Sequence, residues 1–399
     1  MPQAKIALTI PRLGLYGGAE GFGWRLAEAL AAQGHAVDFL CARAECVTPP
    51  AGVRALTLGR PALGRALKNL WFAHAVEDHL EHGHYDLVIG LGRTWSQDIL
   101  RVGGGPQSIF NTLTEAAHGE GLARLFKRLR RALSPSSAVI SWLEARQFER
   151  PANPAQRIVC VSNLVRDWLL EVHPAIDPAN VSVVYNQPDF TRFSPLQADD
   201  RDRRRAELGL SSDDVLICTA GTNFALKGVG TLIRALALLP KNFHLAIAGN
   251  RRPGHWRALA QVNGVSNRVR FAGRVGDMPG FYGTADVFAL PTYYDACSNA
   301  VLEAMACGLP SISSARNGSA VFVPPQRVLA DPGDHKTLAR MLREAAKHTE
   351  TERTAAQTKA FNWPKDLPCG IQPYLDMVRD MLAAKGIHTE PHPAKEDHP

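Results

Sequence analysis

The stretch KIALTIPRLGLYGGAEGFGWRLAEALAAQGH, residues 5–35, indicates the fold because a strand-like run, a glycine-rich turn and a helix-like run follow one another in it. Its first six residues form a β-branched and apolar run that is typical of a buried strand. A glycine-rich turn follows over RLGLYGGAEG, and FGWRLAEALAAQGH then shows apolar residues at helical spacing before a stop at Gly34. A strand, a glycine loop and a helix in this order predict the opening of a doubly wound parallel sheet.

Strand-like and helix-like segments keep alternating along the chain, in two series. The first continues through AVDFLC, a helical run over residues 66–81, YDLVIGLG, RIVCVS and VSVVYN. The second begins with DVLICTAG and continues through FHLAIAGN, RVRFAGRV, ADVFALPT and LPSISS. We therefore predict an α/β fold with two Rossmann-like domains that face a central cleft.

Changes in composition set the domain limits that we expect. The segment NQPDFTRFSPLQADDRDRRRAELG is polar, charged and interrupted by proline, which is typical of an interdomain connection. The last residues contain proline and histidine but few apolar side chains to bury, which favours disorder. We expect an N-terminal domain over residues 1–185, a connection over 186–213, a C-terminal domain over 214–364, a helix over 365–386 with the N-terminal domain as one option for its packing, and a disordered tail over 387–399.

Length and composition narrow the class of protein. The 399 residues suit two domains of roughly 150 to 200 residues, and 45% apolar with 21% charged residues is typical of a soluble globular protein. No apolar run reaches the length of about 18 residues that spans a bilayer, and no signal peptide is visible, so we expect a cytoplasmic protein. The seven cysteines form no C-x2-C pair, so we expect reduced thiols and no metal site.

The stretch YYDACSNAVLEAMACGLPSIS, residues 293–313, carries the strongest functional signal. It follows the predicted strand VFALPT and leads into a helix expected from about Asn299 to Cys307, at the edge of the sheet where ligands bind. Free N–H groups at Ser298, Asn299 and Ala300 would form an anion seat at the start of that helix. Asp295 comes just before this seat, and Glu303 lies one turn inside the helix.

Two carboxylates beside a phosphate would repel it, so we expect them to accept hydrogen bonds from hydroxyl groups on either side. This arrangement predicts a nucleotide sugar, with Asp295 on the sugar and Glu303 on the ribose. The alternative is an ordinary helix cap at Asp295 and a surface residue at Glu303.

Lys227 follows the strand LICTAG, where its ammonium would stabilise the charge that develops on a leaving diphosphate. A solvated lysine is the alternative. Gly17 and Gly18 allow the backbone to approach a ligand, but no G-x-G-x-x-G motif is present there, which argues against a dehydrogenase. His118 is a candidate for the acceptor side, with an ordinary loop histidine as the alternative.

Asp295-x7-Glu303 with the following AMACGLP resembles the E-x7-E signature of retaining glycosyltransferases of family 4, which have the two-domain GT-B fold. The segments GGAEGF, VVYNQPDFTRF, AGTNFALKG and ADVFALPT agree with that family in the same order. The resemblance is specific over the C-terminal domain and looser over the N-terminal domain. NFALKGVGTLIRALALLP and the basic region after DILRVGGG are most similar to enzymes that glycosylate the inner core of bacterial lipopolysaccharide.

This resemblance implies a metal-independent transfer, with retention, from a nucleotide sugar to a lipopolysaccharide-core or related glycan. No cofactor is implied; a UDP-sugar is favoured as co-substrate, and no protein nucleophile is assigned. Two rivals remain: a sugar-nucleotide epimerase or phosphorylase of the same fold, and a non-catalytic nucleotide-sugar-binding protein. From the residue patterns and the resemblance together we expect catalysis by Lys227, Asp295 and Glu303 and donor binding by Gly17, Gly18, Asn223, Arg251, Arg252, Arg274, Cys297, Ser298, Asn299 and Ala300.

The sequence departs from the family pattern at two places. The first acid is Asp295 rather than Glu, which shortens its reach to the donor sugar by one methylene. The family also places an Arg shortly before the Lys of the K-G pair, whereas Thr222, Asn223 and Leu226 occupy that stretch here. Arg251 or Arg252, which follow the strand FHLAIAGN, are the candidates to replace that charge.

The run ARLFKRLRRAL, residues 123–133, places basic residues among Leu and Phe at helical spacing. Such a segment suits an anionic membrane surface, and the net charge of +7 suits anionic partners in general. A solvated helix face and contact with acceptor phosphates are the alternatives, while nucleic acid is not expected because no recognition module accompanies the run. The membrane hypothesis places the protein on the inner face of the cytoplasmic membrane through Arg124, Lys127, Arg128, Arg130 and Arg131.

Overall fold

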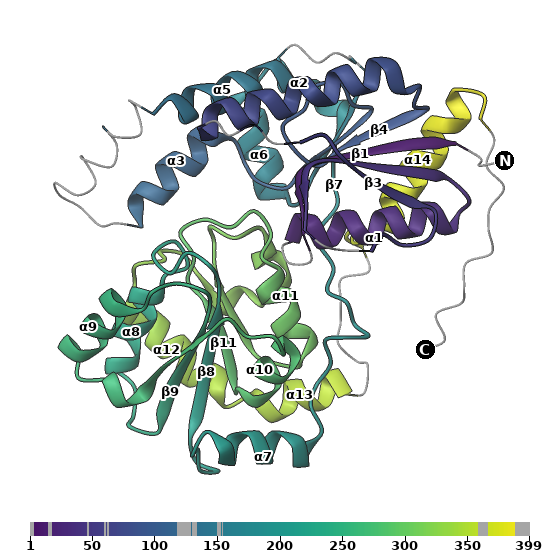
Figure 1. Cartoon of the computed structure of the whole chain (residues 1–399). Coiled ribbons are helices and arrows are strands. Elements are labelled where there is room, and N and C mark those ends of the chain that lie inside the picture. The colour runs from purple at the N-terminus through teal and green to yellow at the C-terminus, as the bar shows by residue number, and fades with distance from the viewer. Residues whose placement is uncertain are drawn as a thin grey trace. The chain divides into compact units, whose positions relative to one another are not determined.

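The computed structural model describes residues 4–14, 18–45, 48–59, 61, 64–117, 129, 134–149, 153, 155–357 and 366–387. The chain divides into two compact units. The described residues of Met1–Ile109, Phe126–Val184 and Pro368–Pro399 belong to the first, and those of Phe110–Leu125 and Tyr185–Leu367 to the second. Each unit is a parallel sheet with helices on both faces (Figure 1), which confirms the predicted α/β fold with two parallel-sheet domains.

The sheet of the first unit has seven parallel strands in the order β3-β2-β1-β4-β5-β6-β7. They are β1 (Lys5–Leu13), β2 (Ala36–Ala44), β3 (Val53–Thr57), β4 (Leu87–Gly90), β5 (Ile99–Val102), β6 (Arg157–Cys160) and β7 (Val181–Val183). The helices are α1 (Gly18–Ala32), α2 (Arg65–Gly83), α5 (Pro135–Phe148), α6 (Asn163–Val172) and α14 (Gln372–Ala384), with α3 (Gln107–Ala116) beginning after β5 and a 3-10 turn, η1 (Pro178–Asn180), before β7.

Strand β1 is buried on both faces, as a central strand of a parallel sheet must be. Ile6, Leu8 and Ile10 alternate along it and pack with α1 and α14. Ala7 points to the opposite face and packs with Phe72 of α2. Figure 1 shows α1 and α14 on one side of this sheet and α2 and α5 on the other. The apolar run in KIALTI therefore sets the centre of the first core.

The sheet of the second unit has six strands in the order β10-β9-β8-β11-β12-β13, and every neighbouring pair is parallel. The strands are β8 (Val215–Ala220), β9 (Phe243–Ala248), β10 (Val269–Gly273), β11 (Val287–Leu290), β12 (Ser311–Ser314) and β13 (Val328–Leu329). The helices are α7 (Ala198–Glu207), α8 (Val229–Ala237), α9 (Gly254–Val262), α10 (Met278–Thr284), α11 (Asn299–Ala306), α12 (His335–Ala346) and α13 (Thr349–Gln357), with 3-10 turns η2 (Ser266–Arg268), η3 (Gly318–Phe322) and η4 (Pro325–Arg327).

Alternation also decides which helices cover which face of the second sheet. Ile217 of β8, Ile247 of β9 and Val287 of β11 share one core with Leu232 of α8 and Leu338 of α12. Figure 1 places α8, α9 and α12 on this side and α10, α11 and α13 on the other. Because all the strands are parallel, the loops after β8, β9, β11 and β12 leave the sheet at one edge.

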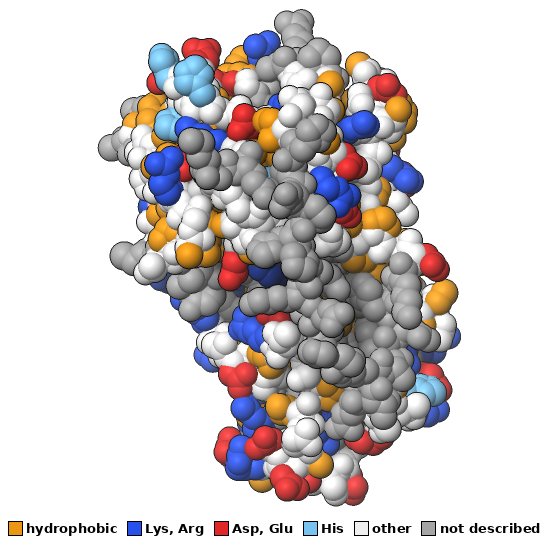
Figure 2. All heavy atoms as spheres, turned by 90° about the vertical axis from the view of Figure 1, so that its right-hand side faces the viewer, with side chains coloured by type: hydrophobic (Ala, Val, Ile, Leu, Met, Phe, Trp, Pro, Cys, Tyr) orange, Lys and Arg blue, Asp and Glu red, His pale blue; other side chains and the backbone are white. Residues whose placement is uncertain are grey.

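Large hydrophobic side chains are rarely exposed in the described part of the chain. On the face shown in Figure 2, the hydrophobic side chains of the described residues are scattered among charges of both signs rather than gathered into one patch. Among the helices that the structure describes, none combines the length and the apolar character needed to cross a membrane. The exposed large hydrophobics are Leu67, Leu129, Trp142, Phe190, Leu238, Val262 and Val321.

Candidate active site

The loop after β8 presents Lys227 at the edge where the parallel strands end. The backbone N–H of Lys227 donates to the carbonyl of Asn223 at 2.9 Å, and Gly228 follows with a positive φ of 70° at the start of α8. A Cβ atom on Gly228 would lie 2.0 Å from the carbonyl oxygen of Pro291, which follows β11. Only glycine therefore lets these two loops approach so closely.

Lys227 forms an ion pair with Asp295 of the loop after β11. The stem of Lys227 lies over Gly221, where a Cβ atom would approach its Cγ within 2.7 Å. The two side chains are 18% and 17% exposed, so the pair is partly shielded from water while still reachable by a ligand. From the sequence we expected Lys227 to bind the diphosphate and Asp295 to bind the sugar. In the structure these two side chains contact each other.

The loop that carries Asp295 is fixed by backbone hydrogen bonds to the loop after β12. The N–H of Asp295 donates to the carbonyl of Arg316 at 3.0 Å, and the N–H of Gly318 donates to the carbonyl of Asp295 at 3.0 Å. Thr292, which begins the same loop, donates from Oγ1 to the carbonyl of Leu226 at 3.0 Å. Three loops thus hold the carboxylate of Asp295 beside Lys227.

Asn317 organises the start of α11. Its side chain is buried, its Oδ1 accepts from the N–H groups of Ser298 at 3.2 Å and Ser319 at 3.1 Å, and its Nδ2 donates to Ser313 Oγ at 2.8 Å. The expectation that the N–H of Ser298 belongs to an anion seat is therefore corrected, because Asn317 already accepts from it. Only the N–H groups of Asn299 and Ala300, which lie in the first turn of α11, are left for such a seat.

Asn186 also contacts this region, although no sequence pattern indicates a role for it. Its Nδ2 donates to the carbonyl of Cys297 at 2.9 Å and to Oδ1 of Asn299 at 2.8 Å. The segment VVYNQPDF contains Asn186, but nothing in the segment itself indicated that its amide reaches a loop more than 100 residues away.

Glu303 accepts a hydrogen bond from the hydroxyl of Tyr282, at 3.1 Å from its Oε2. Tyr282 belongs to α10 and is fully buried. Burial and the negative charge of Glu303 raise the pKa of Tyr282 well above its usual value, so the phenol remains a donor. The sequence did not indicate a site role for Tyr282, because an aromatic residue in an apolar helix usually belongs to the hydrophobic core.

The two arginines proposed to replace the missing family Arg, Arg251 and Arg252, lie on the loop after β9, and Arg274 lies on the loop after β10. Arg251 donates from Nε to the carbonyl of Thr222 at 2.6 Å, which brings it against the very stretch where the family Arg is absent. Arg252 is exposed. Arg274 follows Gly273, whose carbonyl accepts from Gly249 at 2.7 Å, so this loop lies beside the loop of Arg251.

The other residues predicted for the site either lie away from the Lys227–Asp295 pair or are not among the residues that the structure describes. Asn223 helps to shape the Lys227 loop, since its Oδ1 accepts from the N–H of Leu226 at 3.3 Å. Gly18 begins α1 in the first unit, and Gly17, His118 and the five basic residues between 124 and 131 lie outside the described residues. Within the residues that are described, no group of three or more His, Cys, Asp or Glu side chains is placed to hold a metal ion.

Two family models match the chain in succession. Residues 16–192 match the model described as Glycosyltransferase Family 4, and residues 213–348 match the model described as Glycosyl transferases group 1. The chain therefore contains the two domains of family 4-like glycosyltransferases. This confirms the resemblance seen in the sequence.

Curated relatives match the chain over part of their length. A D-inositol 3-phosphate glycosyltransferase of Salinispora arenicola is 30% identical over 264 residues, which cover 60% of this chain and 58% of that protein. The lipopolysaccharide glucosyltransferase WaaG of Escherichia coli is 30% identical over 161 residues, which cover 39% of this chain and 43% of WaaG. The chain thus spans about half the length of such curated relatives.

Solved structures extend the comparison of the fold over the whole chain. The crystal structure of WaaG, a glycosyltransferase involved in lipopolysaccharide biosynthesis, covers 94% of this chain and 99% of its own, with a TM-score of 0.77 and 22% identity. Anabaena Alr3699/HepE in complex with UDP-glucose covers 96% of this chain and 100% of its own, with a TM-score of 0.66 and 16% identity. The chain therefore has the GT-B fold.

Proposed function

We propose that this chain is a retaining glycosyltransferase that moves a sugar from a nucleotide-sugar donor to a lipopolysaccharide-core or related glycan acceptor. The observation that carries the proposal is the ion pair of Lys227 with Asp295 at the edge of the second sheet, with Glu303 following in α11. A UDP-sugar is the favoured donor, and the HepE structure with UDP-glucose supports that choice.

Each residue has a separate task in binding the donor. The ammonium of Lys227 has three N–H donors, so it can keep Asp295 and still bind diphosphate oxygens. Its charge stabilises the diphosphate most when the glycosidic bond is breaking, which favours the transition state. Asp295 accepts hydrogen bonds from hydroxyls of the donor sugar, and Glu303, oriented by Tyr282, accepts from the ribose.

The transfer proceeds without a metal and without a protein nucleophile in this proposal. The bond between the anomeric carbon and the nucleoside diphosphate breaks, the acceptor oxygen bonds to that carbon on the same face, and the proton of the acceptor hydroxyl passes to the departing diphosphate. Proton NMR of the anomeric position of the product tests retention, because inversion would change the coupling constant of that proton. Turnover that survives EDTA tests the independence from metal.

The deciding experiment measures consumption of UDP-, ADP- and GDP-sugars with and without acceptor. We expect one donor to be consumed only when acceptor is present. Release of free nucleotide with an altered sugar in the absence of acceptor would instead identify an epimerase. Binding without turnover under any condition would identify a non-catalytic nucleotide-sugar-binding protein.

The relatives support a polyhydroxylated acceptor. The name of the Salinispora arenicola relative includes D-inositol 3-phosphate, and the name of WaaG includes lipopolysaccharide. Deacylated lipopolysaccharide core oligosaccharide and D-inositol 3-phosphate are therefore the two acceptors to test first.

A membrane role for the basic run remains a separate part of the proposal. Its basic and apolar side chains suit the inner face of the cytoplasmic membrane, where a lipid-linked acceptor is presented, and each basic residue near an anionic surface contributes about 1 kcal/mol. Charge reversal at Lys127, Arg128 and Arg131 should abolish cosedimentation with phosphatidylglycerol vesicles. A variant that still binds vesicles but loses turnover would place these residues at the acceptor instead.

A further inference from the structure

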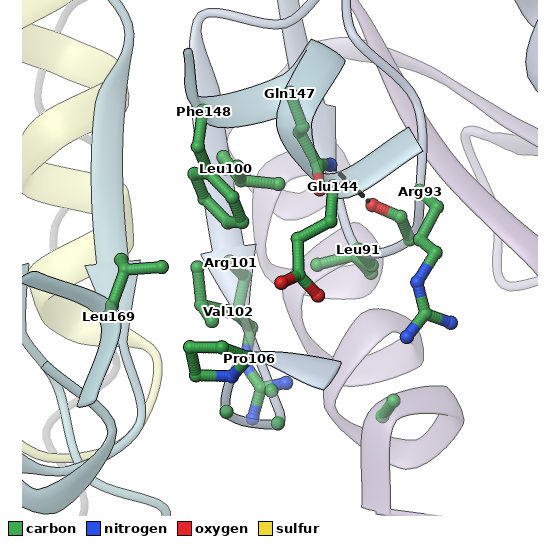
Figure 3. Close-up of a pocket in the computed structure, with 15 residues that line it drawn as sticks. Leu91, Arg93, Leu100, Arg101, Val102, Pro106, Glu144, Gln147, Phe148 and Leu169 are labelled. Atoms are coloured by element: carbon green, nitrogen blue, oxygen red, sulfur yellow. Dashed lines mark hydrogen bonds between the residues drawn. The ribbon is translucent and has the colours of Figure 1, made fainter. Parts of the chain in front are cut away.

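Polar side chains from other elements hold the starts of α3 and α11, and they do so in opposite ways. In the first unit, the carboxylate of Glu144 of α5 points into a pocket of about 230 Å³ (Figure 3). It accepts from the backbone N–H of Gln107, the first residue of α3, at 2.9 Å, and His173 Nε2 lies 3.3 Å from it. A carboxylate of the chain therefore already occupies the first N–H group of α3.

In the second unit, the residue before α11 does not cap the helix. Ser298 is the N-cap residue and has an extended backbone, but within the described chain its side chain makes no capping hydrogen bond. A serine at this position usually accepts from an N–H group of the first turn. Because Ser298 does not, its side chain leaves the N–H groups of Asn299 and Ala300 open to a ligand.

The start of α11 is held through its acceptor atoms instead. Asn186 Nδ2 donates to the carbonyl of Cys297 at 2.9 Å and to Oδ1 of Asn299 at 2.8 Å. An amide nitrogen carries two N–H donors, so Asn186 can serve both acceptors at once. Ser319 Oγ donates to the carbonyl of Ser298 at 3.0 Å. These contacts fix the first turn of the helix without using the N–H group of Asn299.

Asn186 belongs to the segment that follows β7. Two residues earlier, Val184 is buried in the core of the first unit. Between them, Tyr185 is buried and packs edge-on against Phe322 of η3, with 5.2 Å between the ring centroids. The chain thus passes within two residues from the first core to the amide that holds α11.

The rest of this segment is also fastened to the second unit. Asp189 Oδ1 accepts from the N–H of Thr191 at 3.0 Å, and the carbonyl of Asp189 accepts from the N–H of Phe193 at 2.8 Å. The ring of Phe193 lies 6.2 Å from that of Tyr282, whose hydroxyl donates to Glu303. One segment therefore contacts both the start of α11 and the tyrosine that orients Glu303.

We propose that Asn186 is a positioning residue for the donor diphosphate. Its amide fixes the start of α11, so that the N–H groups of Asn299 and Ala300 bind the diphosphate together with Lys227. Asn186 acts through the helix and does not touch the donor. The inference rests on the proposed function, because it concerns the donor of that transfer.

The test compares UDP with uridine, the same nucleoside without the diphosphate, by titration calorimetry on the full chain. Asn186→Ala should weaken UDP binding roughly tenfold, because the two hydrogen bonds that fix the helix start are lost. Uridine affinity should stay within about twofold of wild type. A general disturbance of the second unit would weaken both ligands alike, so the ratio of the two affinities is the deciding quantity.

Asn242→Ala is the matched control in the same unit. Asn242 is half-buried like Asn186, and its Nδ2 donates to the carbonyl of Asp213 at 2.6 Å. It precedes β9, so it lies at the opposite edge of the sheet from the loop of Lys227. We expect this variant to bind UDP and uridine as wild type does.

Asn186→Leu separates hydrogen bonding from side-chain volume. Leucine is similar in size to asparagine but has no N–H donor, so UDP should bind Asn186→Leu as weakly as Asn186→Ala. Denaturant unfolding of both variants and of Asn242→Ala would confirm that each is folded before its affinities are compared.

A measurement on the wild-type chain does not depend on the folding of a variant. If the hydrogen bonds of Asn186 favour UDP binding, thermodynamic linkage requires that UDP binding favours those hydrogen bonds. We therefore expect UDP to slow the solvent exchange of the Asn186 Nδ2 protons in nitrogen-15 NMR spectra, and uridine to leave it unchanged. The side-chain amide of Asn242 is the internal reference.

Four results would overturn the inference while leaving the proposed function intact, provided that the wild-type chain binds UDP. They are wild-type UDP affinity in Asn186→Ala, equal losses for UDP and uridine, full recovery of UDP affinity in Asn186→Leu, and an Asn186 exchange rate that UDP does not change. Failure of the wild-type chain to bind any nucleotide or nucleotide sugar would instead count against the proposed function.

Discussion

The ammonium of Lys227 and the carboxylate of Asp295 form an ion pair across the loops that follow two neighbouring strands, β8 and β11. The residues are 68 positions apart in the chain, and the close approach at Gly228 brings their loops together. The pair joins the group proposed for the diphosphate to the group proposed for the sugar. The diphosphate of a donor that binds here must therefore contact the Lys227 ammonium while Asp295 is also paired with it.

Lys227→Ala should lower the turnover number more than the donor affinity. The charge on the leaving diphosphate develops toward the transition state, and removing one such donor typically costs about 2.7 to 4 kcal/mol, or roughly a hundredfold or more in rate. Steady-state kinetics with the accepted UDP-sugar would measure both quantities. A raised Michaelis constant with normal turnover would show that Lys227 acts only in binding.

Asp295→Asn should separate nucleotide binding from catalysis. With the negative charge removed, the diphosphate of UDP no longer competes with Asp295 for Lys227, so we expect UDP to bind several-fold tighter. Turnover should fall because the sugar loses a charge-assisted hydrogen bond. Calorimetry with UDP decides the first part, and weaker UDP binding would contradict it.

Tyr282→Phe should weaken donor binding through Glu303. The substitution removes the hydroxyl that donates to Glu303 Oε2, a bond whose net contribution is about 0.5 to 1.5 kcal/mol, or roughly two- to tenfold in affinity. The loss should be smaller when Glu303 is already Gln, whose amide oxygen accepts only a neutral hydrogen bond, and a double-mutant cycle would measure the difference. Tyr374→Phe, at an equally buried tyrosine of the first unit, is the matched control and should leave donor affinity unchanged.

Gly228→Ala should destabilise the second unit and displace Lys227. Its Cβ atom would lie 2.0 Å from the backbone oxygen of Pro291, and its φ of 70° is already unfavourable for alanine. Gly264→Ala has nearly the same φ, 69°, but meets no atom within 4 Å, so it isolates the cost of conformation, about 1 kcal/mol. Denaturant unfolding should show a clearly larger loss for Gly228→Ala than for Gly264→Ala.

The sequence predicted the two sheets and the edge that carries Lys227 and Asp295 because both depend on local patterns. Apolar alternation located the strands, and residues that directly follow parallel strands, such as Lys227 and Asp295, must share one edge. It did not predict partners that depend on how distant segments pack. Tyr282 reaches Glu303 across 21 positions, and Glu144 reaches His173 across 29. The N–H of Ser298 was misjudged for the same reason, since Asn317 arrives from another strand end.

His173 should titrate above its ordinary value, and Glu144 should be one cause. Burial alone would lower its pKa, but hydrogen bonds and charges from Glu144 and Glu149 outweigh that effect and raise the pKa above 6.5. The ring of Phe148, 5.0 Å away between centroids, adds no charge. Because the folded state binds this proton more tightly than the unfolded state, the stabilisation is fully present below about pH 6.5. It is lost as the pH rises through the raised value.

NMR titration of the His173 ring would measure this pKa directly, and Glu144→Gln should lower it by removing a charge and weakening a hydrogen bond. Denaturant unfolding of wild type and His173→Gln at several pH values would measure the linked stability. The difference between the two should shrink as the pH rises, and His35→Gln is the control, because burial lowers the pKa of His35 and gives the opposite trend. A pKa of wild-type His173 below 6.5 would contradict the raised pKa expected here. It would also mean that no imidazolium offsets the charge of Glu144.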